Sequence, residues 1–274
     1  MLNLAVGRAS ALPLSSSHRH LEIAPIIHAV GLPASVNEFT DDIYHKELAR
    51  LREPGALAKR LTDIDRSKAT RRIYIMGCGR SGTWLLTTVM CTYKDVEVVG
   101  VELIVEHFGL FQTDRSTLIL KRDYRAYQTV KEIPPQIEIL YIVRHPFEVL
   151  TSHLASSQRP YHILPDRWLG EMSALQWLSA ADRKKTKIIR YEDLVGAPDQ
   201  MHAELATFFN LQIEVPIDTV VKISKDATDK HKRDADKIRY LQKIKSDLGD
   251  MLSWVASTYH YDVSLPPEKG LLPL

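Results

Sequence analysis

The stretch from Arg72 to Leu86, RIYIMGCGRSGTWLL, predicts a buried strand that runs into a glycine-bearing turn and then opens a helix. Alternation and β-branching in its first residues favour the strand, and its glycines give the turn conformations that are closed to other residues. A helix that begins near Ser81 or Gly82 points its free N–H groups and its positive dipole end into the turn. The stretch therefore predicts a binding loop for phosphate or sulfate, to which Arg80 adds a full positive charge.

Gly77 and Gly82 have the G-x-x-x-x-G spacing of a phosphate-binding loop. The pair that follows is Thr83-Trp84, where nucleotide triphosphatases have Lys followed by Ser or Thr. Because that lysine and the magnesium-holding hydroxyl beside it are absent, the loop suits an anion that is handled without a metal ion. A strand-glycine-helix turn can also be no more than a tight connection, so a second motif has to decide.

A second candidate phosphate site follows the most apolar predicted strand, at 137–143. Arg144 leaves that strand, and a helix that starts near Pro146 would place Ser152 in its second turn. Arg144 would then bind a phosphate through a forked, charge-assisted pair, and Ser152 would bind it through its hydroxyl. The alternative is that Arg144 pairs with a carboxylate of the protein and Ser152 caps nothing.

Taken together, the two motifs resemble those of sulfotransferases, which use 3′-phosphoadenosine 5′-phosphosulfate (PAPS) as cosubstrate and require no magnesium. Ile189 to Leu194, IRYEDL, is similar to an element that follows a late strand in this family. The resemblance covers about residues 71–209, and it places Tyr191 near the adenine. The nucleotide-binding set that it implies is Gly79, Arg80, Ser81, Gly82, Thr83, Trp84, Arg144, Ser152 and Tyr191. The basic run Lys230 to Arg233 matches a basic loop of the family by position and charge only.

The strand-end element Lys121-Arg122-Asp123 stands where cytosolic members of the family carry K-x-H. Asp123 replaces the usual catalytic histidine, so either this carboxylate or another group has to take the acceptor's proton. The stretch 100–102, GVE, resembles the G-E-E of the tyrosylprotein and some carbohydrate sulfotransferases, which carries a catalytic glutamate. The resemblance is therefore closer to that type than to the cytosolic type. It implies a catalytic set of Arg80, Glu102, Lys121 and Asp123.

Glu102 is our leading prediction for the base, and Asp123, Glu106 and His107 are the alternatives. The acceptor that the resemblance favours is a carbohydrate hydroxyl, ahead of a lipid, a phenolic metabolite or a protein tyrosine. A phosphate-loop kinase acting on a small molecule and a non-catalytic nucleotide-binding module are the competing functions. The missing magnesium ligands argue against the kinase, and turnover with any acceptor would exclude the module.

Strands and helices alternate along the chain. This alternation predicts one α/β domain over residues 1–274, in which helices flank a parallel sheet in a P-loop-like three-layer architecture. Ligands are expected at the carboxyl ends of the strands. We expect a loosely ordered start at 1–35, a nucleotide-binding core at 70–210 and a helical part at 211–274. Further predictions are two short helices around Pro54-Gly55, strands at 96–99 and 187–191, and long helices at 166–181 and 235–259.

The composition excludes several classes of protein. The 274 residues include 36 Lys and Arg against 34 Asp and Glu, and a net charge of +2 is no signal for nucleic-acid binding. Two cysteines, Cys78 and Cys91, offer neither a disulfide framework nor a metal site, and they favour a reducing compartment. No apolar run approaches the length of a membrane span, so the sequence predicts a soluble, cytoplasmic protein.

Overall fold

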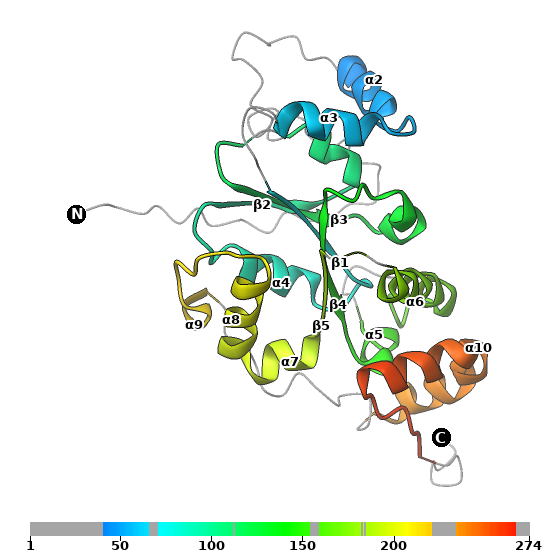
Figure 1. The fold of residues 1–274 in the computed structure, drawn as a ribbon. Coiled ribbons are helices and arrows are strands. Elements are labelled where there is room, and N and C mark those ends of the chain that lie inside the picture. Colours follow the sequence, from blue (N-terminus) through cyan, green and yellow to red (C-terminus); the bar gives the residue numbers. More distant parts are fainter. Residues whose placement is uncertain are drawn as a thin grey trace.

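The computed structural model describes residues 41–65, 71–111, 113–153, 159–181, 183, 185–220 and 234–266. Within them, five parallel strands form one sheet in the order β2-β3-β1-β4-β5 (Figure 1). The middle strand is the one predicted before the glycine-bearing turn, and the predicted α/β class is confirmed. The predictions for 1–35 and for Lys230 to Arg233 lie outside the described residues. The strands are β1 (Arg71–Met76), β2 (Val96–Leu103), β3 (Thr117–Arg122), β4 (Glu138–Val143) and β5 (Thr186–Arg190).

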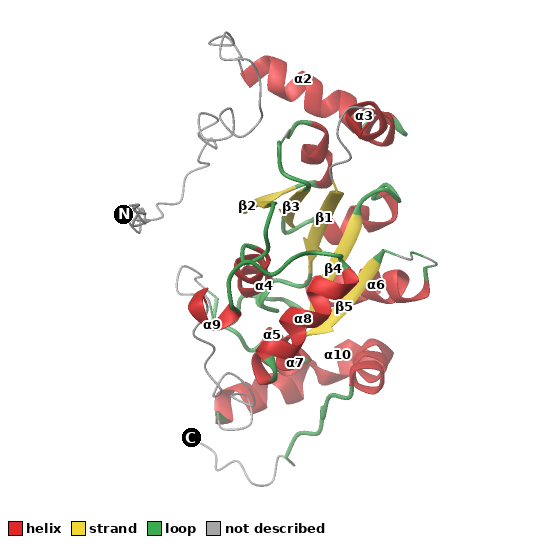
Figure 2. Cartoon of the chain, turned by 60° about the vertical axis from the view of Figure 1, so that its left-hand side comes forward, coloured by secondary structure: helices red, strands yellow, loops and turns green. Residues whose placement is uncertain are grey.

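Helices cover both faces of the sheet, which gives the three layers that were predicted (Figures 1 and 2). Side chains of β1 alternate between two cores, because successive residues of a strand point to opposite faces. Ile73 and Ile75 pack with α4 (Thr83–Met90) and α8 (Pro198–Phe208), whereas Tyr74 and Met76 pack with α6 (Pro165–Ala180) and α10 (Ala235–Tyr259). The other helices are α2 (Asp41–Leu51), α3 (Ala56–Asp65), α5 (Pro146–Leu150), α7 (Tyr191–Gly196), α9 (Ile217–Val220) and the 3-10 helices η1 (Val105–Gly109) and η2 (Ala126–Glu132).

The first two described helices pack beside the sheet, against η1. They are separated at Pro54-Gly55, as predicted, where Gly55 takes a φ of +78° that favours glycine. The packing is close, because a Cβ on Gly109 would lie 2.8 Å from Cδ1 of Leu51. Segments before the central strand therefore contribute to the surroundings of the strand ends.

Two predicted boundaries near the motifs were wrong. β2 does not end at residue 99 but continues to Leu103 through a shift of register between Val99 and Glu102, because its partner β3 continues beside it. The last predicted strand ends at Arg190, and Tyr191 begins a helix instead. The next residue, Glu192, accepts hydrogen bonds from the backbone N–H of His145 and from the Tyr261 hydroxyl, which tie this turn to the start of α5 and to the segment after α10.

The helix after β4 is also shorter than the sequence predicted. It ends at Leu150, so Ser152 lies beyond its end and not in its second turn. The hydroxyl of Thr151 donates to the carbonyl oxygen of Phe147 at 2.6 Å, and the hydroxyl of Ser152 donates to that of Val149 at 2.8 Å. The backbone N–H of Ser152 also donates to Val149 at 3.2 Å, three residues back and not four, so the α-helical pattern has ended at this point.

Candidate active site

Residues Gly77 to Gly82, here called the anion loop, form a tight turn between β1 and α4. Gly77 and Gly82 have φ angles of 148° and 103°, in the region that favours glycine. A Cβ on Gly82 would lie 2.5 Å from Cδ2 of Tyr191, and one on Gly77 would lie 2.5 Å from the carbonyl oxygen of Ile142. Both glycines are therefore required by close packing as well as by their backbone angles.

The anion loop presents groups that an oxyanion can use. The helix α4 begins at Thr83 with Gly82 as its N-cap, so the unpaired N–H groups of its first turn border the loop. The Ser81 hydroxyl is buried and has no hydrogen-bond partner among the described residues. Arg80 is exposed beside it. These groups fit a phosphate or sulfate, whereas Trp84, also predicted to bind the nucleotide, is 70% exposed.

Arg144 lies at the end of β4, against the anion loop. Its Nη1 donates to the carbonyl oxygen of Arg80 at 3.2 Å, and its Cζ lies 4.2 Å from the centroid of the Tyr191 ring. Its Nη2 lies 3.7 Å from Oε2 of Glu148, a buried carboxylate. The predicted cation is thus beside the loop, and it also has the carboxylate contact that the alternative interpretation required.

Tyr191 is brought to the anion loop, since its half-buried ring lies between Gly82 and the guanidinium of Arg144. The half-buried Ser152 instead donates its hydroxyl to a backbone carbonyl. Joint binding of one phosphate by Arg144 and Ser152 stays a prediction. A bound phosphate would have to draw the serine hydroxyl from its present partner.

Lys121 and Glu102 form an ion pair on neighbouring strands. The register pairs Glu102 of β2 with Lys121 of β3, and Lys121 with Ile75 of β1, so the three side chains share the sheet face that α4 covers. The Nζ of Lys121 lies 3.5 Å from Oε1 of Glu102. The lysine is buried, while the glutamate side chain is 54% exposed. The pair therefore offers a carboxylate that an acceptor can reach, beside a fixed positive charge.

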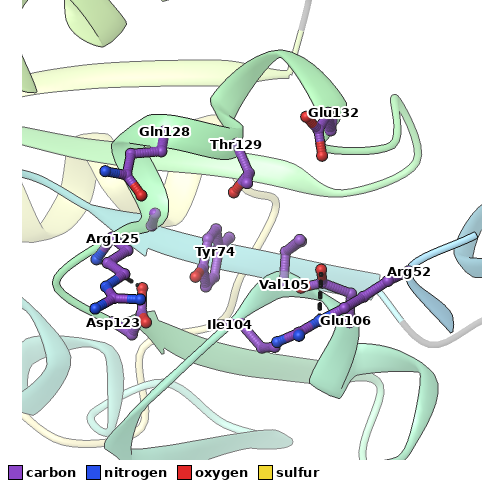
Figure 3. Close-up of a pocket in the computed structure, with 11 residues that line it drawn as sticks. Arg52, Tyr74, Ile104, Val105, Glu106, Asp123, Arg125, Gln128, Thr129 and Glu132 are labelled. Atoms are coloured by element: carbon purple, nitrogen blue, oxygen red, sulfur yellow. Dashed lines mark hydrogen bonds and ion pairs between the residues drawn. The ribbon is translucent and has the colours of Figure 1, made fainter. Parts of the chain in front are cut away.

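Asp123 does not lie with Lys121 and Glu102 but lines a polar pocket of about 370 Å³ (Figure 3). Its Oδ1 accepts the backbone N–H of Arg125 at 2.9 Å, which ties the carboxylate to the turn after β3. Tyr74 reaches the pocket from the sheet face opposite to the Lys121 side chain. The two leading candidates for the base are therefore on different sides of the sheet. The polar side chains that line the pocket are Arg52, Tyr74, Glu106, Asp123, Arg125, Gln128, Thr129 and Glu132.

Glu106 and His107, the other candidate bases, have different surroundings. Glu106 lines the polar pocket, with its Oε1 3.6 Å from Nε of Arg52. His107 is buried, and its Nδ1 accepts the backbone N–H of Ile104 at 3.2 Å while its Nε2 is hydrogen-bonded to the Tyr44 hydroxyl. Burial lowers the pKa of His107 to about 4. Both ring nitrogens of His107 thus bind protein groups, and the residue connects α2 to η1.

Sequence reasoning missed a buried charge cluster beside the anion loop. Glu171 of α6 is buried, with its Oε1 3.2 Å from Nη1 of Arg122 and 4.0 Å from Nη2 of Arg167. Burial raises the pKa of Glu171 to about 7, although both arginines act to lower it. Burial also raises the pKa of the nearby Cys78 thiol. A signal was present, because Glu171 interrupts an apolar face of the predicted helix at 166–181.

His162 was missed as well. Its backbone N–H donates to the carbonyl oxygen of Ser152 at 3.0 Å, which brings its segment to the end of the second motif. Burial lowers the pKa of the imidazole, as do the charges of Arg167 and Arg80, while Glu102 raises it. The charged side chains of Arg80, Glu102 and Arg167 therefore all act on the imidazole of His162, although the four residues come from separate segments.

The described residues give no sign of a metal centre. No group of three His, Cys, Asp or Glu side chains among them is arranged to hold a metal ion. Cys78 is buried and Cys91 is exposed, and both are free thiols. None of the helices in the described ranges is both long and apolar enough to cross a membrane.

No family model and no curated protein matches the chain. Similar solved structures include several sulfotransferases. The sulfotransferase domain from the curacin biosynthetic pathway is 16% identical, with 72% of this chain and 99% of that chain covered and a TM-score of 0.48. A sulfotransferase from Alicyclobacillus acidocaldarius is 14% identical, with 71% of this chain and 98% of that chain covered and a TM-score of 0.45. A mouse sulfotransferase complexed with PAP (3′-phosphoadenosine 5′-phosphate) is 16% identical, with 78% of this chain and 93% of that chain covered and a TM-score of 0.42.

Proposed function

We propose that this protein is a PAPS-dependent sulfotransferase that transfers a sulfuryl group to a hydroxyl of an acceptor. The observation that carries the proposal is the arrangement at the anion loop. A glycine-built turn at a helix N-terminus lies beside Arg80, and Arg144 contacts both the loop carbonyl and the Tyr191 ring. The resemblance of both sequence motifs to those of sulfotransferases supports the same conclusion. When bound, PAPS supplies an activated sulfuryl group on a phosphate leaving group.

The anion loop would hold the 5′-phosphosulfate. Its backbone N–H groups are held by the turn before the ligand arrives, and preorganised donors of this kind stabilise charge that develops on a leaving group. The exposed Arg80 would add its positive charge. Ser81 would direct its unpaired hydroxyl to the same oxygens. Arg144, with Ser152, would bind the 3′-phosphate, and Tyr191 would lie near the adenine.

Glu102 would act as the base that takes the proton of the acceptor hydroxyl. Its carboxylate is exposed, lies beside the Lys121 ammonium, and affects the same imidazole as Arg80 does. A positioned carboxylate of this kind is suited to proton removal. Asp123 is the alternative, and it would require the reacting hydroxyl itself to lie in the polar pocket.

The polar pocket is our candidate for the site that holds the body of the acceptor. The backbone N–H of Asp123, a residue of the pocket, donates to the carbonyl oxygen of Leu103, next to Glu102, so an acceptor in the pocket would extend its reacting hydroxyl past these strand ends to Glu102. Its side chains combine carboxylates, guanidinium groups, an amide and a hydroxyl, so they offer both donors and acceptors to a polyhydroxylated molecule. Tyr74 lies buried beneath these side chains, and its hydroxyl donates to the carbonyl oxygen of Leu103 at 2.7 Å. A carbohydrate hydroxyl is therefore the acceptor that we propose.

Calorimetry with PAP and PAPS in the presence of a chelator tests the proposed donor. We expect micromolar binding without divalent metal, because the loop lacks the lysine and hydroxyl pair of a magnesium nucleotide site. A screen with labelled PAPS against carbohydrate, lipid, phenolic and peptide acceptors then tests transfer. Tighter binding of ATP with magnesium would favour a kinase, and donor binding without transfer to any acceptor would favour a non-catalytic module.

A further inference from the structure

We propose that Arg167 is a third guanidinium of the donor site and binds oxygens of the sulfuryl group that is transferred. The inference rests on the proposed function and adds to it a residue of α6, outside both sequence motifs. It follows from three observations: the contact of Arg167 with the anion loop, its few protein partners, and the carboxylate that holds it.

Arg167 lies directly against the anion loop. A Cβ on Gly79 would be 3.2 Å from Nη2 of Arg167 and 3.6 Å from its Cζ. The guanidinium can approach the backbone this closely because residue 79 has no side chain. The helix end at Thr83 suits the 5′-phosphate, which leaves the Gly79 end of the loop, next to Arg80, for the sulfuryl group.

The guanidinium of Arg167 has little to bind within the protein. Among the described residues its side chain has no hydrogen bond, and its Nε is buried without a partner. Its side chain is 23% exposed, so some of its donors can reach a ligand. A guanidinium presents donors in a fixed fork that matches the oxygens of an anion. An oxyanion in the loop would supply the partners that the protein does not.

Glu171 is the positioning residue for this arginine. Its carboxylate lies 3.2 Å from Arg122 and 4.0 Å from Arg167, so it interacts more strongly with Arg122 than with Arg167. The longer contact leaves much of the charge on Arg167 available to a ligand. Arg80 and Arg167 both lower the pKa of His162, which is consistent with two guanidinium groups that converge on one volume.

The test compares the affinities of PAPS and PAP, which differ by the sulfuryl group. For Arg167→Ala, calorimetry should show PAPS binding weaker by roughly tenfold to a hundredfold, the scale of lost charge-assisted hydrogen bonds, and PAP binding nearly unchanged. Arg167→Lys should restore part of the PAPS affinity. Arg115→Ala is the control, because Arg115 is an exposed arginine that precedes β3, at the end of the strand away from the anion loop. It should leave both affinities unchanged.

Gly79→Ala provides a second variant that keeps the charge. The new Cβ would meet only the tips of Ile163 and Arg167, so the fold should persist while the guanidinium is displaced. We expect the same loss for PAPS over PAP, with an unchanged thermal midpoint. Equal losses for PAPS and PAP, no loss for either, or a change confined to the acceptor KM would each overturn the assignment. Failure of the wild-type protein to bind either nucleotide would instead overturn the proposed function.

Discussion

The anion loop and the polar pocket are assembled from the chain in opposite ways. Six consecutive residues form the loop, and its contacts Arg144 and Tyr191 directly follow the two neighbouring strands on one side. The pocket collects side chains from the end of α2, from η1, from the turn after β3 and from η2 (Figure 3). Backbone conformation therefore forms the anion loop, the proposed donor side, and the packing of distant segments forms the polar pocket, the proposed acceptor side. Changes on one side should leave the function of the other intact.

The largest effect should come from Glu102→Gln, which keeps the shape of the side chain and removes its basicity. We expect kcat to fall by about a hundredfold or more, the scale of a lost general base, with PAPS affinity near that of the wild type. Steady-state kinetics and calorimetry check the two parts. Asp123→Asn is the matched variant on the pocket side. If it abolishes turnover while Glu102→Gln does not, the base belongs to the pocket and Glu102 has been misassigned.

Gly82→Ala should damage the donor side next most strongly. The residue has a φ of 103°, and the new Cβ would lie 2.5 Å from the Tyr191 ring. Backbone strain of about 1–3 kcal/mol adds to this overlap, so PAP affinity should fall by roughly tenfold or more. Gly100→Ala is the control, because a Cβ there has no atom within 4 Å. Normal PAP binding by Gly82→Ala would show that the geometry of the anion loop does not determine donor affinity.

Arg144→Ala sharpens the comparison within the donor side. Loss of a charged hydrogen bond costs roughly 1.5–3 kcal/mol, so PAPS binding should weaken by about tenfold to a hundredfold. Binding of adenosine 5′-phosphosulfate, which lacks the 3′-phosphate, should barely change. Ser152→Ala should show the same selectivity more weakly. An equal loss for both nucleotides would mean that Arg144 serves the fold through Glu148 and Tyr191.

Features that depend on residues close together in the sequence could be predicted, and features that depend on residues far apart could not. The anion loop, the parallel sheet and the position of Arg144 at a strand end follow from local patterns, such as β-branched runs and glycine spacing. The position of Tyr191 came from the family resemblance. Ser152 was misplaced because α5 ends at Leu150, and both the hydroxyl and the N–H of Ser152 bind the carbonyl oxygen of Val149. A local sequence pattern does not show to which carbonyl oxygen a hydroxyl will donate a hydrogen bond.

The charge cluster of Arg122, Arg167 and Glu171 depends on a contact between β3 and α6, residues about fifty apart in the chain. No spacing rule joins them, and only an acid on an apolar helix face pointed to such a pair. The polar pocket is similar, because Arg52 and Gln128 meet through tertiary packing alone. Sequence reasoning therefore located the residues of the anion loop and missed most of those that line the polar pocket.

Acid should loosen the packing of α2 on η1, beside the pocket. Burial holds the pKa of His107 near 4, below its ordinary value of 6.5, so protons bind the unfolded chain more readily. The contribution to stability is complete above pH 6.5 and is lost as the pH falls toward 4; between pH 7 and pH 5 the loss is about 2 kcal/mol. Denaturant unfolding at several pH values measures it. His107→Asn should flatten this part of the profile, whereas exposed His45→Asn should not. An unchanged profile in His107→Asn would contradict the assignment.

The smallest effect should come from Gln128→Ala in the polar pocket. The exposed amide lines the pocket and has only a long hydrogen bond, 3.5 Å, to the Tyr127 hydroxyl, so its removal should leave the fold unchanged. Loss of one neutral hydrogen bond is worth roughly 0.5–1.5 kcal/mol, so the acceptor KM should rise severalfold while PAPS affinity stays constant. Gln200→Ala, on the exposed surface of α8, is the matched control. A weaker affinity for PAPS in Gln128→Ala would show that the donor extends into the pocket, and the division between the two regions would then have to be redrawn. An unchanged acceptor KM would place the acceptor elsewhere, with the exposed carboxylate of Glu102 as the point from which to search for its site.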